Sequence, residues 1–263
     1  MSIRTGHEKT RIQNLENPGL SANGEPLSGR ELAERVRDLQ GDRLLLSFSG
    51  GKDSLAMWLF LRRLDVFAEV IPYFLYWLPG LSFVEQALAY YERVFGVHIV
   101  QLPHPLFYRL FGDAVYQLPQ VTALVEALDL PEYDYADVDN LLAAERGLPA
   151  HYFCAIGIRA ADNIDRRNLI HQQGALGIKR RHYYYPIWDW TIDQVADEIL
   201  TAGVKLPADY RYWGRTLAAY DYQYLKPLRE HFPADYDRIL EWFPMLEAEM
   251  FRYERLGKYG KAN

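Results

Sequence analysis

The chain has 263 residues, 49% of them hydrophobic, which is enough for a substantial core in one domain or in a domain with a smaller appendage. Its formal net charge of −6 argues against a protein that coats nucleic acid over its whole surface. The single cysteine, Cys154, excludes an intrachain disulfide and any self-contained iron–sulfur or zinc site made from cysteines. We expect a cytoplasmic protein, because residues 1–23 are too polar for a signal peptide and no apolar run is long enough to span a membrane.

The first part of the chain predicts a polar arm, a helix, a strand and a second helix. Residues 1–26 are polar and contain several Asn and Gly residues, which favours a flexible N-terminal arm. A helix is expected from Ser28 to Gly41. The apolar run Leu44–Phe48 then predicts a short buried strand, and Leu55–Leu61, which is apolar nearly all round, predicts a buried helix.

The turn between this strand and this helix, Ser49-Gly50-Gly51-Lys52-Asp53-Ser54, has the residues of a phosphate-binding loop. Its glycines allow backbone N–H groups to approach an anion, and the helix that follows points its positive end at the same place. The serines add hydroxyl donors and the lysine adds a charge. We therefore predict that these six residues bind the phosphates of a nucleotide. The alternative is an ordinary strand–turn–helix with a Lys-Asp pair on its surface.

The order of residues in this turn differs from that of a Walker A loop. A Walker A loop has a further Gly, separated by four residues from the Gly-Lys pair, and has Ser or Thr directly after the Lys. In this chain Leu46 occupies the position of the first Gly, and Asp53 follows Lys52. The turn is therefore a different kind of phosphate loop.

Strands and helices continue to alternate after this loop. Glu69–Trp77 predicts a second buried strand, in which Pro72 suggests a late start or a place near the edge of the sheet. A helix over Phe83–Phe95 and a third strand over Val97–Val100 follow. Such short spacing predicts a doubly wound α/β fold with a mostly parallel sheet. Ligands of such sheets bind beyond the carboxyl ends of the strands, where Ser49–Ser54 would lie.

Residues 103–149 interrupt the alternation with short helical stretches. We place these at Leu106–Phe111, Val121–Leu128 and Val138–Glu145 and interpret the segment as a helical insertion that forms a lid or a wall. The nucleotide-binding domain is then expected to cover residues 27–215.

The rest of the chain predicts mainly helices. Thr191 should cap a helix that runs to Leu200. Residues 216–263 are expected to form a C-terminal helical appendage, with helical stretches at Tyr220–Glu230 and Tyr236–Leu256 and interruptions at Pro233 and Pro244.

A second candidate phosphate contact follows the strand predicted at His151–Ile156. Gly157 and Arg159 come directly after this strand, and Arg166 follows at helical spacing. A guanidinium can hold two phosphate oxygens at once, which favours a role of Arg159 toward phosphates. The alternative is the start of a helix with solvated arginines.

A basic and aromatic stretch comes next. Lys179, Arg180, Arg181 and His182 precede Tyr183–Trp190, a combination that is typical of surfaces contacting phosphates and bases. We predict that Arg166, Lys179, Arg180 and Arg181 contact an acceptor substrate. A charge run of this kind can equally be a solvated loop.

Four segments match one known family in the same order. Ser49–Ser54 resembles the PP-loop, and Phe83-Val84-Glu85 resembles a Phe-x-Glu segment after the second strand. Gly157-Ile158-Arg159, with Asp162 and Arg166, resembles a Gly-x-Arg-x-x-x-Ser-x-x-Arg element, and Pro186–Thr191, with Val195, resembles Pro-x-x-Asp-Trp-Thr. Over roughly residues 40–215 the chain thus resembles the phosphoadenosine phosphosulfate (PAPS) reductase-like branch of the PP-loop ATP pyrophosphatase superfamily.

The resemblance implies an adenine nucleotide alpha-hydrolase-like fold, with ATP or a related nucleotide lying across the carboxyl edge of the sheet. The loop residues and Gly157 would contact the nucleotide. Lys52, Asp53 and Arg159 would be the catalytic residues, with Arg159 facing the phosphates or the substrate. Members of this superfamily typically split ATP into AMP and pyrophosphate.

The chain also departs from this branch. Its reductases use a cysteine in a C-terminal Glu-Cys-Gly-Leu-His motif, and many relatives hold a cluster with paired cysteines. No cysteine follows Cys154, which lies in an apolar strand and is expected to be a small core residue. Asn163 replaces the usual Ser, and no acidic residue follows the second strand. Neither thiol-driven PAPS reduction nor an iron–sulfur cluster is therefore expected.

The leading hypothesis is an enzyme that uses ATP and Mg²⁺ to adenylate an acceptor and releases pyrophosphate. Lys52 would offset charge on the leaving group. Asp53 could hold Mg²⁺, or it could pair with Lys52 instead. His104, His151 and His182 are candidates for a general base by residue type alone.

Two other functions stay open at this point. The chain could bind PAPS or its precursor and use a thiol that a protein partner supplies, or it could be a non-catalytic nucleotide-sensing subunit. The acceptor could be a nucleobase of a nucleic acid, a small molecule or a sulfur-transfer substrate. No membrane partner is expected.

Overall fold

The computed structural model describes residues 19–21, 23–24, 26–149, 151–177, 182–216 and 219–256. In this part of the chain one sheet of six strands has the order β3-β2-β1-β4-β6-β5. The strands are β1 (Arg43–Ser47), β2 (Glu69–Tyr76), β3 (Val100–Pro103), β4 (Cys154–Ile156), β5 (Leu176–Gly177) and β6 (Tyr183–Tyr184). β1 pairs in parallel with β2 and β4, and β4 pairs in parallel with β6, whereas β5 runs antiparallel to β6. The predicted α/β fold with a mostly parallel sheet is confirmed.

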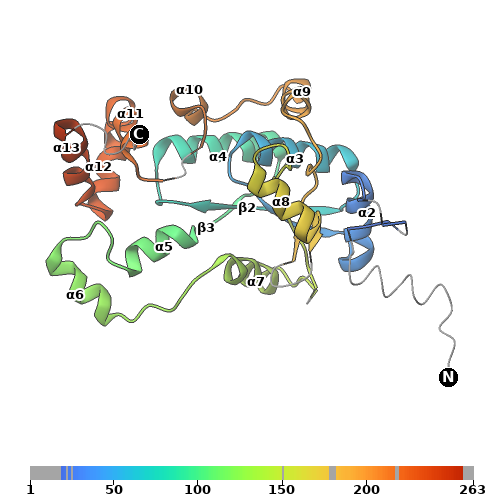
Figure 1. The fold of residues 1–263 in the computed structure, drawn as a ribbon, viewed down its shortest axis with the longest axis horizontal. Helices are drawn as coiled ribbons and strands as arrows, with labels where there is room; N and C mark the ends of the chain where they lie inside the picture. Colours follow the sequence, from blue (N-terminus) through green and yellow to red (C-terminus); the bar gives the residue numbers. More distant parts are fainter. Residues whose placement is uncertain are drawn as a thin grey trace. The chain divides into compact units, whose positions relative to one another are not determined.

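Helices separate most of the strands along the chain (Figure 1). They are α2 (Gly29–Gln40), α3 (Lys52–Leu64), α4 (Ser82–Phe95), α5 (Pro105–Gly112), α6 (Pro119–Ala127), α7 (Tyr135–Glu145), α8 (Ile164–Gln173), α9 (Ile192–Ala202), α10 (Asp209–Trp213), α11 (Tyr222–His231), α12 (Pro233–Trp242) and α13 (Leu246–Leu256).

The chain divides into two compact units. The first consists of the described residues up to Phe74, His98–Val100 and Ala136–Lys205. The second consists of Leu75–Val97, Gln101–Tyr135 and the described residues from Leu206 onward. The short helices α5 and α6 therefore group with the C-terminal helices, whereas α7 groups almost entirely with the strands of the first unit.

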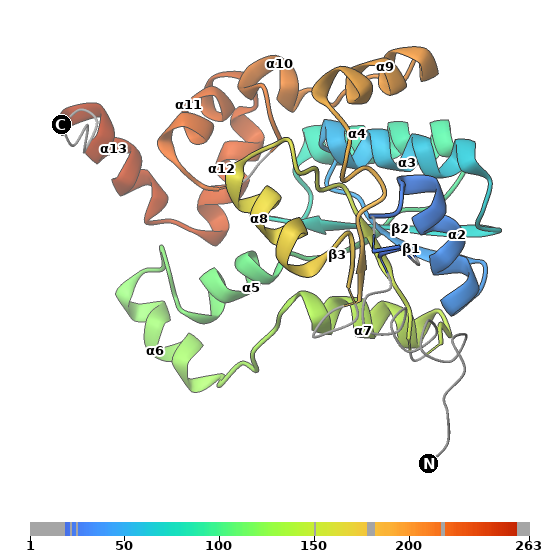
Figure 2. The same cartoon turned by 45° about the vertical axis from the view of Figure 1, so that its right-hand side comes forward.

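The first unit is a layered α/β structure. Leu44, Leu45 and Leu46 of β1 are fully buried, as is usual for a central parallel strand that is covered on both faces. Helices α3 and α9 lie on one face of the strands and α7 lies on the other (Figures 1 and 2). Because helices cover both faces, the unit is doubly wound, as predicted.

The helix starts predicted at Ser28 and Thr191 are confirmed. Each residue is an N-cap whose hydroxyl accepts a hydrogen bond from a first-turn amide, and each forms a reciprocal capping box, Ser28 with Glu31 and Thr191 with Gln194. No described helix is long and apolar enough to cross a membrane.

Two strand predictions are corrected. The third strand begins at Val100 and not at Val97, because α4 ends in a left-handed Gly96 and the next residues form a bend before the backbone becomes extended. Of the two alternatives that Pro72 suggested, a late start of the strand is wrong, and a place near the edge is confirmed, because β2 is next to the edge strand β3. Pro72 lies inside β2, in register with Leu46, and β2 lies between β3 and β1. Proline removes one backbone donor there, but its fixed φ is compatible with an extended chain.

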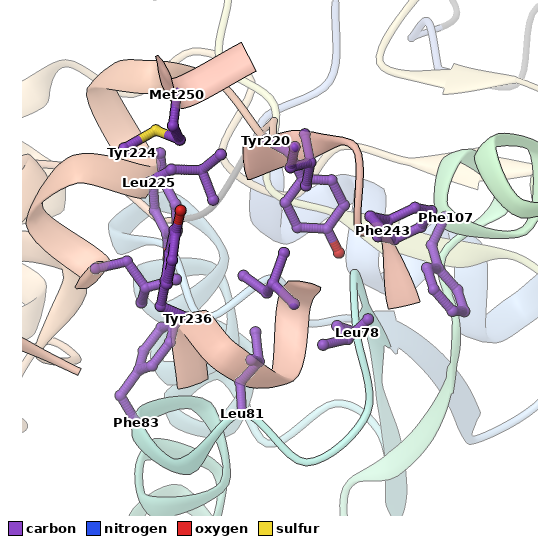
Figure 3. Packing of buried hydrophobic residues seen from close by; sticks show 13 residues of the cluster. Leu78, Leu81, Phe83, Phe107, Tyr220, Tyr224, Leu225, Tyr236, Phe243 and Met250 are labelled. Carbon is purple, nitrogen blue, oxygen red and sulfur yellow. The ribbon is translucent and has the colours of Figure 1, made fainter. Parts of the chain in front are cut away.

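The second unit has its own aromatic and aliphatic core. Figure 3 shows this cluster, in which α11, α12 and α13 pack against the start of α4 and against α5. Buried Asp235 of α12 accepts hydrogen bonds from the Ser82 amide (2.8 Å) and the Ser82 hydroxyl (2.7 Å), so it caps α4. The interruption predicted at Pro244 is confirmed, because it lies between α12 and α13 and divides the helical stretch Tyr236–Leu256.

Cys154 is a core residue, as expected. Its side chain is fully buried in β4, and its sulfur lies 3.3 Å from the hydroxyl of Tyr73. That hydroxyl also donates to Asp139 of α7 at 2.8 Å. The thiol therefore belongs to the packing between the sheet and α7.

Replacing Cys154 with Ala should lower the free energy of unfolding by about 1–2 kcal/mol, because it leaves a small void in the core. The affinity for nucleotide should not change. Denaturant unfolding and nucleotide titration of the parent and C154A check this. A variant that unfolds like the parent but has lost nucleotide-dependent turnover would identify the thiol as a reactive group.

Candidate functional site

The loop between β1 and α3 has the backbone geometry of an anion site. Gly50 adopts a positive φ of 72°, a conformation that favours glycine. Gly51 is the N-cap of α3 and supplies no side-chain hydrogen bond to the first turn of the helix. The side chain of the N-cap therefore does not compete with an anion for the amides at the start of α3.

The two serines of the loop bond within the loop itself. The Ser54 hydroxyl, which is buried, donates to the Gly51 carbonyl at 2.9 Å and lies 3.0 Å from the Ser49 hydroxyl. The Ser49 amide donates to Ser54 Oγ at 3.2 Å, and the Gly51 amide donates to Ser49 Oγ at 3.3 Å. These hydrogen bonds join Ser49 and Gly51 at the start of the loop to Ser54 at its end.

Five charged side chains form an alternating ion-pair chain from this loop to the loop after β4. Lys52 Nζ lies 2.7 Å from Asp53 Oδ2, and Arg159 Nε lies 2.7 Å from Asp53 Oδ1. Arg159 Nη2 contacts one oxygen of Asp162, and Arg166 Nη1 contacts the other. We call these residues the ion-pair chain. It joins three cations through two carboxylates and so carries one net positive charge.

The ion-pair chain is buried at its centre and open at its ends. The side chain of Arg159 is 4% exposed, and those of Asp53 and Asp162 are 18% and 14% exposed. The two terminal cations are more open, with exposed fractions of 32% for Lys52 and 40% for Arg166. Lys52 and Arg166 are thus the members that solvent reaches most easily.

Arg159 uses every one of its side-chain nitrogens on protein groups. Besides the two carboxylates, its Nη1 donates to the carbonyl of Trp190 at 3.3 Å. A buried guanidinium needs such partners, because an unpaired charge in the interior costs several kcal/mol. The backbone of the loop after β6 thus also supports this arginine, and the Ala160 amide donates to the Trp188 carbonyl at 2.8 Å in the same region.

Gly157 is needed for close contact between the two loops. A Cβ built at this position would lie 2.8 Å from the Ser54 amide nitrogen and 2.9 Å from the carbonyl carbon of Asp53. Only glycine therefore lets the loop after β4 approach the first turn of α3 so closely.

The structure brings most of the predicted nucleotide site together. The residues of the Ser49–Ser54 loop, Gly157 and Arg159 lie at one edge of the first unit, and Arg166 joins them through Asp162. Lys179, Arg180 and Arg181 lie outside the described residues. Their proposed contact with an acceptor stays a prediction.

Part of the basic and aromatic stretch is a core element. Tyr183 and Tyr184 form β6, and together with Tyr185 they are buried. Tyr183 and Tyr185 stack on each other, with ring centroids 4.6 Å apart. These three rings therefore do not offer a surface for stacking bases, contrary to the expectation from the sequence.

The three histidines considered as a general base lie at strand ends or at a helix cap. His151 and His182 precede β4 and β6, at the amino ends of strands whose carboxyl ends lead into the site. His104 caps α5 by accepting from the Leu106 amide at 3.0 Å and stacks on Trp77. Burial lowers the pKa of His104 to about 4, so its imidazole is neutral at pH 7.

Sequence reasoning missed the role of Asp162 and of the Trp190 carbonyl. The spacing offered a signal for Asp162, since it lies three residues after Arg159 and four before Arg166, where side chains meet on one face of a turn or helix. Nothing in the sequence indicates a contact to the Trp190 carbonyl.

Asp53 is the carboxylate that would suit Mg²⁺ in this loop, and each of its oxygens contacts a cation of the protein. Among the described residues, no group of three or more His, Cys, Asp or Glu side chains is arranged to hold a metal ion.

Among known proteins, the chain is similar to solved structures and not to any family model or curated sequence. No family model matches the chain, and no curated protein matches it. Phosphoadenylyl-sulfate (PAPS) reductase from Candida auris, solved with phosphate, is 16% identical, with a TM-score of 0.42 and coverage of 82% of this chain and 100% of that chain.

Two further structures have similar scores. FMN adenylyltransferase from Candida glabrata, solved with FMN and the ATP analog AMPCPP, is 11% identical with a TM-score of 0.43; the match covers 80% of this chain and 65% of that chain. The NH3-dependent NAD synthetase from Campylobacter jejuni subsp. jejuni, solved with nitrate, is 12% identical with a TM-score of 0.39, and the match covers 90% and 100% of the two chains. We infer the function below from the residues of the site and not from these similarities.

Replacing Gly157 with Ala should force the backbone of the two loops apart, because the new methyl group would meet main-chain atoms of α3. We expect a loss of about 1–3 kcal/mol in the free energy of unfolding and weaker binding of pyrophosphate. Gly112 of α5 is a matched control, since a Cβ there would meet only Leu130 Cδ1 at 3.9 Å. If G157A and G112A unfold and bind alike, close contact of the loops is not required.

Proposed function

We propose that the protein is an ATP-using enzyme of the PP-loop type that transfers the adenylyl group of ATP to an acceptor and releases pyrophosphate. The observation that carries this proposal is the start of α3. There a glycine N-cap makes no side-chain hydrogen bond to the first turn, and Lys52 is the first residue of the helix. A helix start with an adjacent lysine is suited to the β- and γ-phosphates of a nucleotide.

In the proposed reaction a nucleophilic atom of the acceptor attacks the α-phosphorus of ATP. A bond forms between that atom and the α-phosphorus, the bond from the α-phosphorus to the bridging oxygen breaks, and pyrophosphate leaves with that oxygen. The amides at the start of α3 and the ammonium of Lys52 would stabilise the negative charge that builds on the leaving group. Because the loop is already closed by its serine bonds, little reorganisation would accompany binding.

Mg²⁺ would screen the charge of the phosphates. Asp53 would be its ligand in the protein, and it could serve as such once Lys52 moves from the carboxylate to the phosphates.

The acceptor would be held at the other end of the ion-pair chain. Arg166 is the member of that chain most open to solvent, and Lys179, Arg180 and Arg181 would add to its positive charge. An anionic acceptor fits this set best, either a polynucleotide or a small molecule with an acidic group. A protein partner that donates sulfur would fit the same reaction if the acceptor is adenylated before sulfur transfer.

The test is a product analysis with ATP labelled in its α- or γ-phosphate, with Mg²⁺, and with DNA, RNA or a sulfur donor supplied in turn. We expect AMP or an adenylylated acceptor, together with pyrophosphate. ADP with inorganic phosphate would contradict the proposal. Turnover of PAPS with an added thiol carrier would favour the sulfur-nucleotide alternative, and tight binding without turnover would favour a nucleotide sensor.

Lys52→Ala should weaken ATP binding or turnover about 10- to 150-fold, the effect of losing a hydrogen bond to a charged group worth roughly 1.5–3 kcal/mol. The thermal unfolding temperature should change little, because the side chain is partly exposed. Lys226→Ala, at an exposed position of α11, is the matched control. If K52A binds and turns over ATP like K226A, the loop is not the nucleotide site.

A further inference from the structure

Arg159 is the most deeply buried charge of the ion-pair chain. Its guanidinium touches two carboxylates and one main-chain carbonyl, which come from the loop after β1, the loop after β4 and the loop after β6. Three of its five N–H groups have these acceptors, and its side chain is only 4% exposed, so the guanidinium presents little surface to a phosphate. A phosphate that took the place of one of these acceptors would leave that acceptor buried and poorly paired, which is unfavourable.

Asp53 is the ion-pair partner through which Arg159 reaches the start of α3. One carboxylate oxygen of Asp53 is held by Arg159 and the other by Lys52. With Arg159 in place, the negative charge of Asp53 is shared between two cations. Without Arg159, Lys52 would be the cation left to Asp53 within the ion-pair chain, and this pairing would hold the lysine away from a ligand. If Lys52 then turned to a ligand, the negative charge of Asp53 would stay uncompensated beside the loop.

From these contacts we infer that Arg159 is a positioning residue and not a phosphate ligand. It neutralises and orients Asp53 at the start of α3 and so leaves Lys52 able to turn toward the phosphates. This inference rests on the proposed function, and it assigns to Arg159 a different role from the direct contact that the sequence suggested.

Asp162 completes the arrangement from the other side. Its first oxygen pairs with Arg159 and its second with Arg166. The same carboxylate therefore links the Arg159 guanidinium to the more exposed Arg166. Asp162 would thus be a second positioning residue, acting through Arg159.

A double-mutant cycle between Asp53 and Arg159 tests the inference. The variants are R159M, which replaces the guanidinium with an apolar side chain of similar length, D53N, and the double variant. The probe is inorganic pyrophosphate, measured by isothermal titration calorimetry with and without Mg²⁺ at a temperature where circular dichroism shows each variant to be folded.

If Arg159 acts through Asp53, R159M should weaken pyrophosphate binding by about tenfold in the parent and by no more than about twofold in the D53N background. A coupling of this size is ordinary for residues in direct contact. If Arg159 contacts the phosphate itself, the loss will be the same in both backgrounds, and that result would overturn the inference.

The free energies of unfolding of the same four proteins test the Arg159–Asp53 link independently of the proposed function. R159M should be less stable than the parent, and adding D53N should restore part of the loss, because it removes a carboxylate that has lost one of its two cations. Additive effects on unfolding would contradict the Arg159–Asp53 link even if pyrophosphate binds. If the stability cycle shows the coupling but the parent does not bind pyrophosphate, the proposed function fails while the link itself stands.

The matched control for Asp162 is Asp165, three residues further along the chain. D162N should weaken pyrophosphate binding in the same direction as R159M, whereas D165N, at an exposed position in the first turn of α8, should leave it unchanged. Equal affinities of D162N and D165N would remove Asp162 from this role.

Discussion

The contact between Asp53 and Arg159 is the interaction on which the candidate site depends. It joins the first turn of α3 to the loop after β4 through a 2.7 Å ion pair, and Arg159 is buried. Burying a cation is unfavourable unless acceptors surround it, so this arginine can exist only where the three loops meet. The loop that we propose for phosphate binding is held in place by the same contact. The conformation of the Ser49–Ser54 loop therefore depends on the rest of the folded first unit and not on the six loop residues alone.

The sheet makes this contact possible. Because β1 and β4 are parallel neighbours, with Leu46 beside Ala155 and Ser47 beside Ile156, both strands deliver their following loops to the same edge. Because Gly157 has no Cβ, the two loops can approach each other more closely than any other residue at this position would allow. The parallel strands bring the two loops to one edge, Gly157 allows them to touch, and the ion pairs then join them. The more exposed ends of the ion-pair chain are Lys52 and Arg166.

Much of the fold and part of the site could be predicted from the sequence, for identifiable reasons. The caps at Ser28 and Thr191 and the glycine loop after Leu44–Phe48 are local signals, and local signals are readable in a single sequence. The role of Arg159 could not be predicted, because two of its three partners, Asp53 and the Trp190 carbonyl, come from segments far from it in the chain. Tyr183–Tyr185 were misread for the same reason. A run of aromatic residues beside basic ones looks like a contact surface until the neighbouring strands bury it. Pro72 indicated a place near the edge of the sheet, which β2 has beside β3, but it does not mark the start of the strand.

The proposed phosphate site and the role of Arg159 can both be tested by a crystal structure of the protein with AMP and pyrophosphate. We expect pyrophosphate at the start of α3, bonded to backbone amides of the Ser49–Ser54 loop, with Lys52 Nζ turned from Asp53 to the anion. We also expect the Asp53–Arg159 contact to persist in that complex. Pyrophosphate bound directly to the Arg159 guanidinium, with Asp53 released from it, would contradict the positioning role. Pyrophosphate bound away from this loop would contradict the proposed function as well.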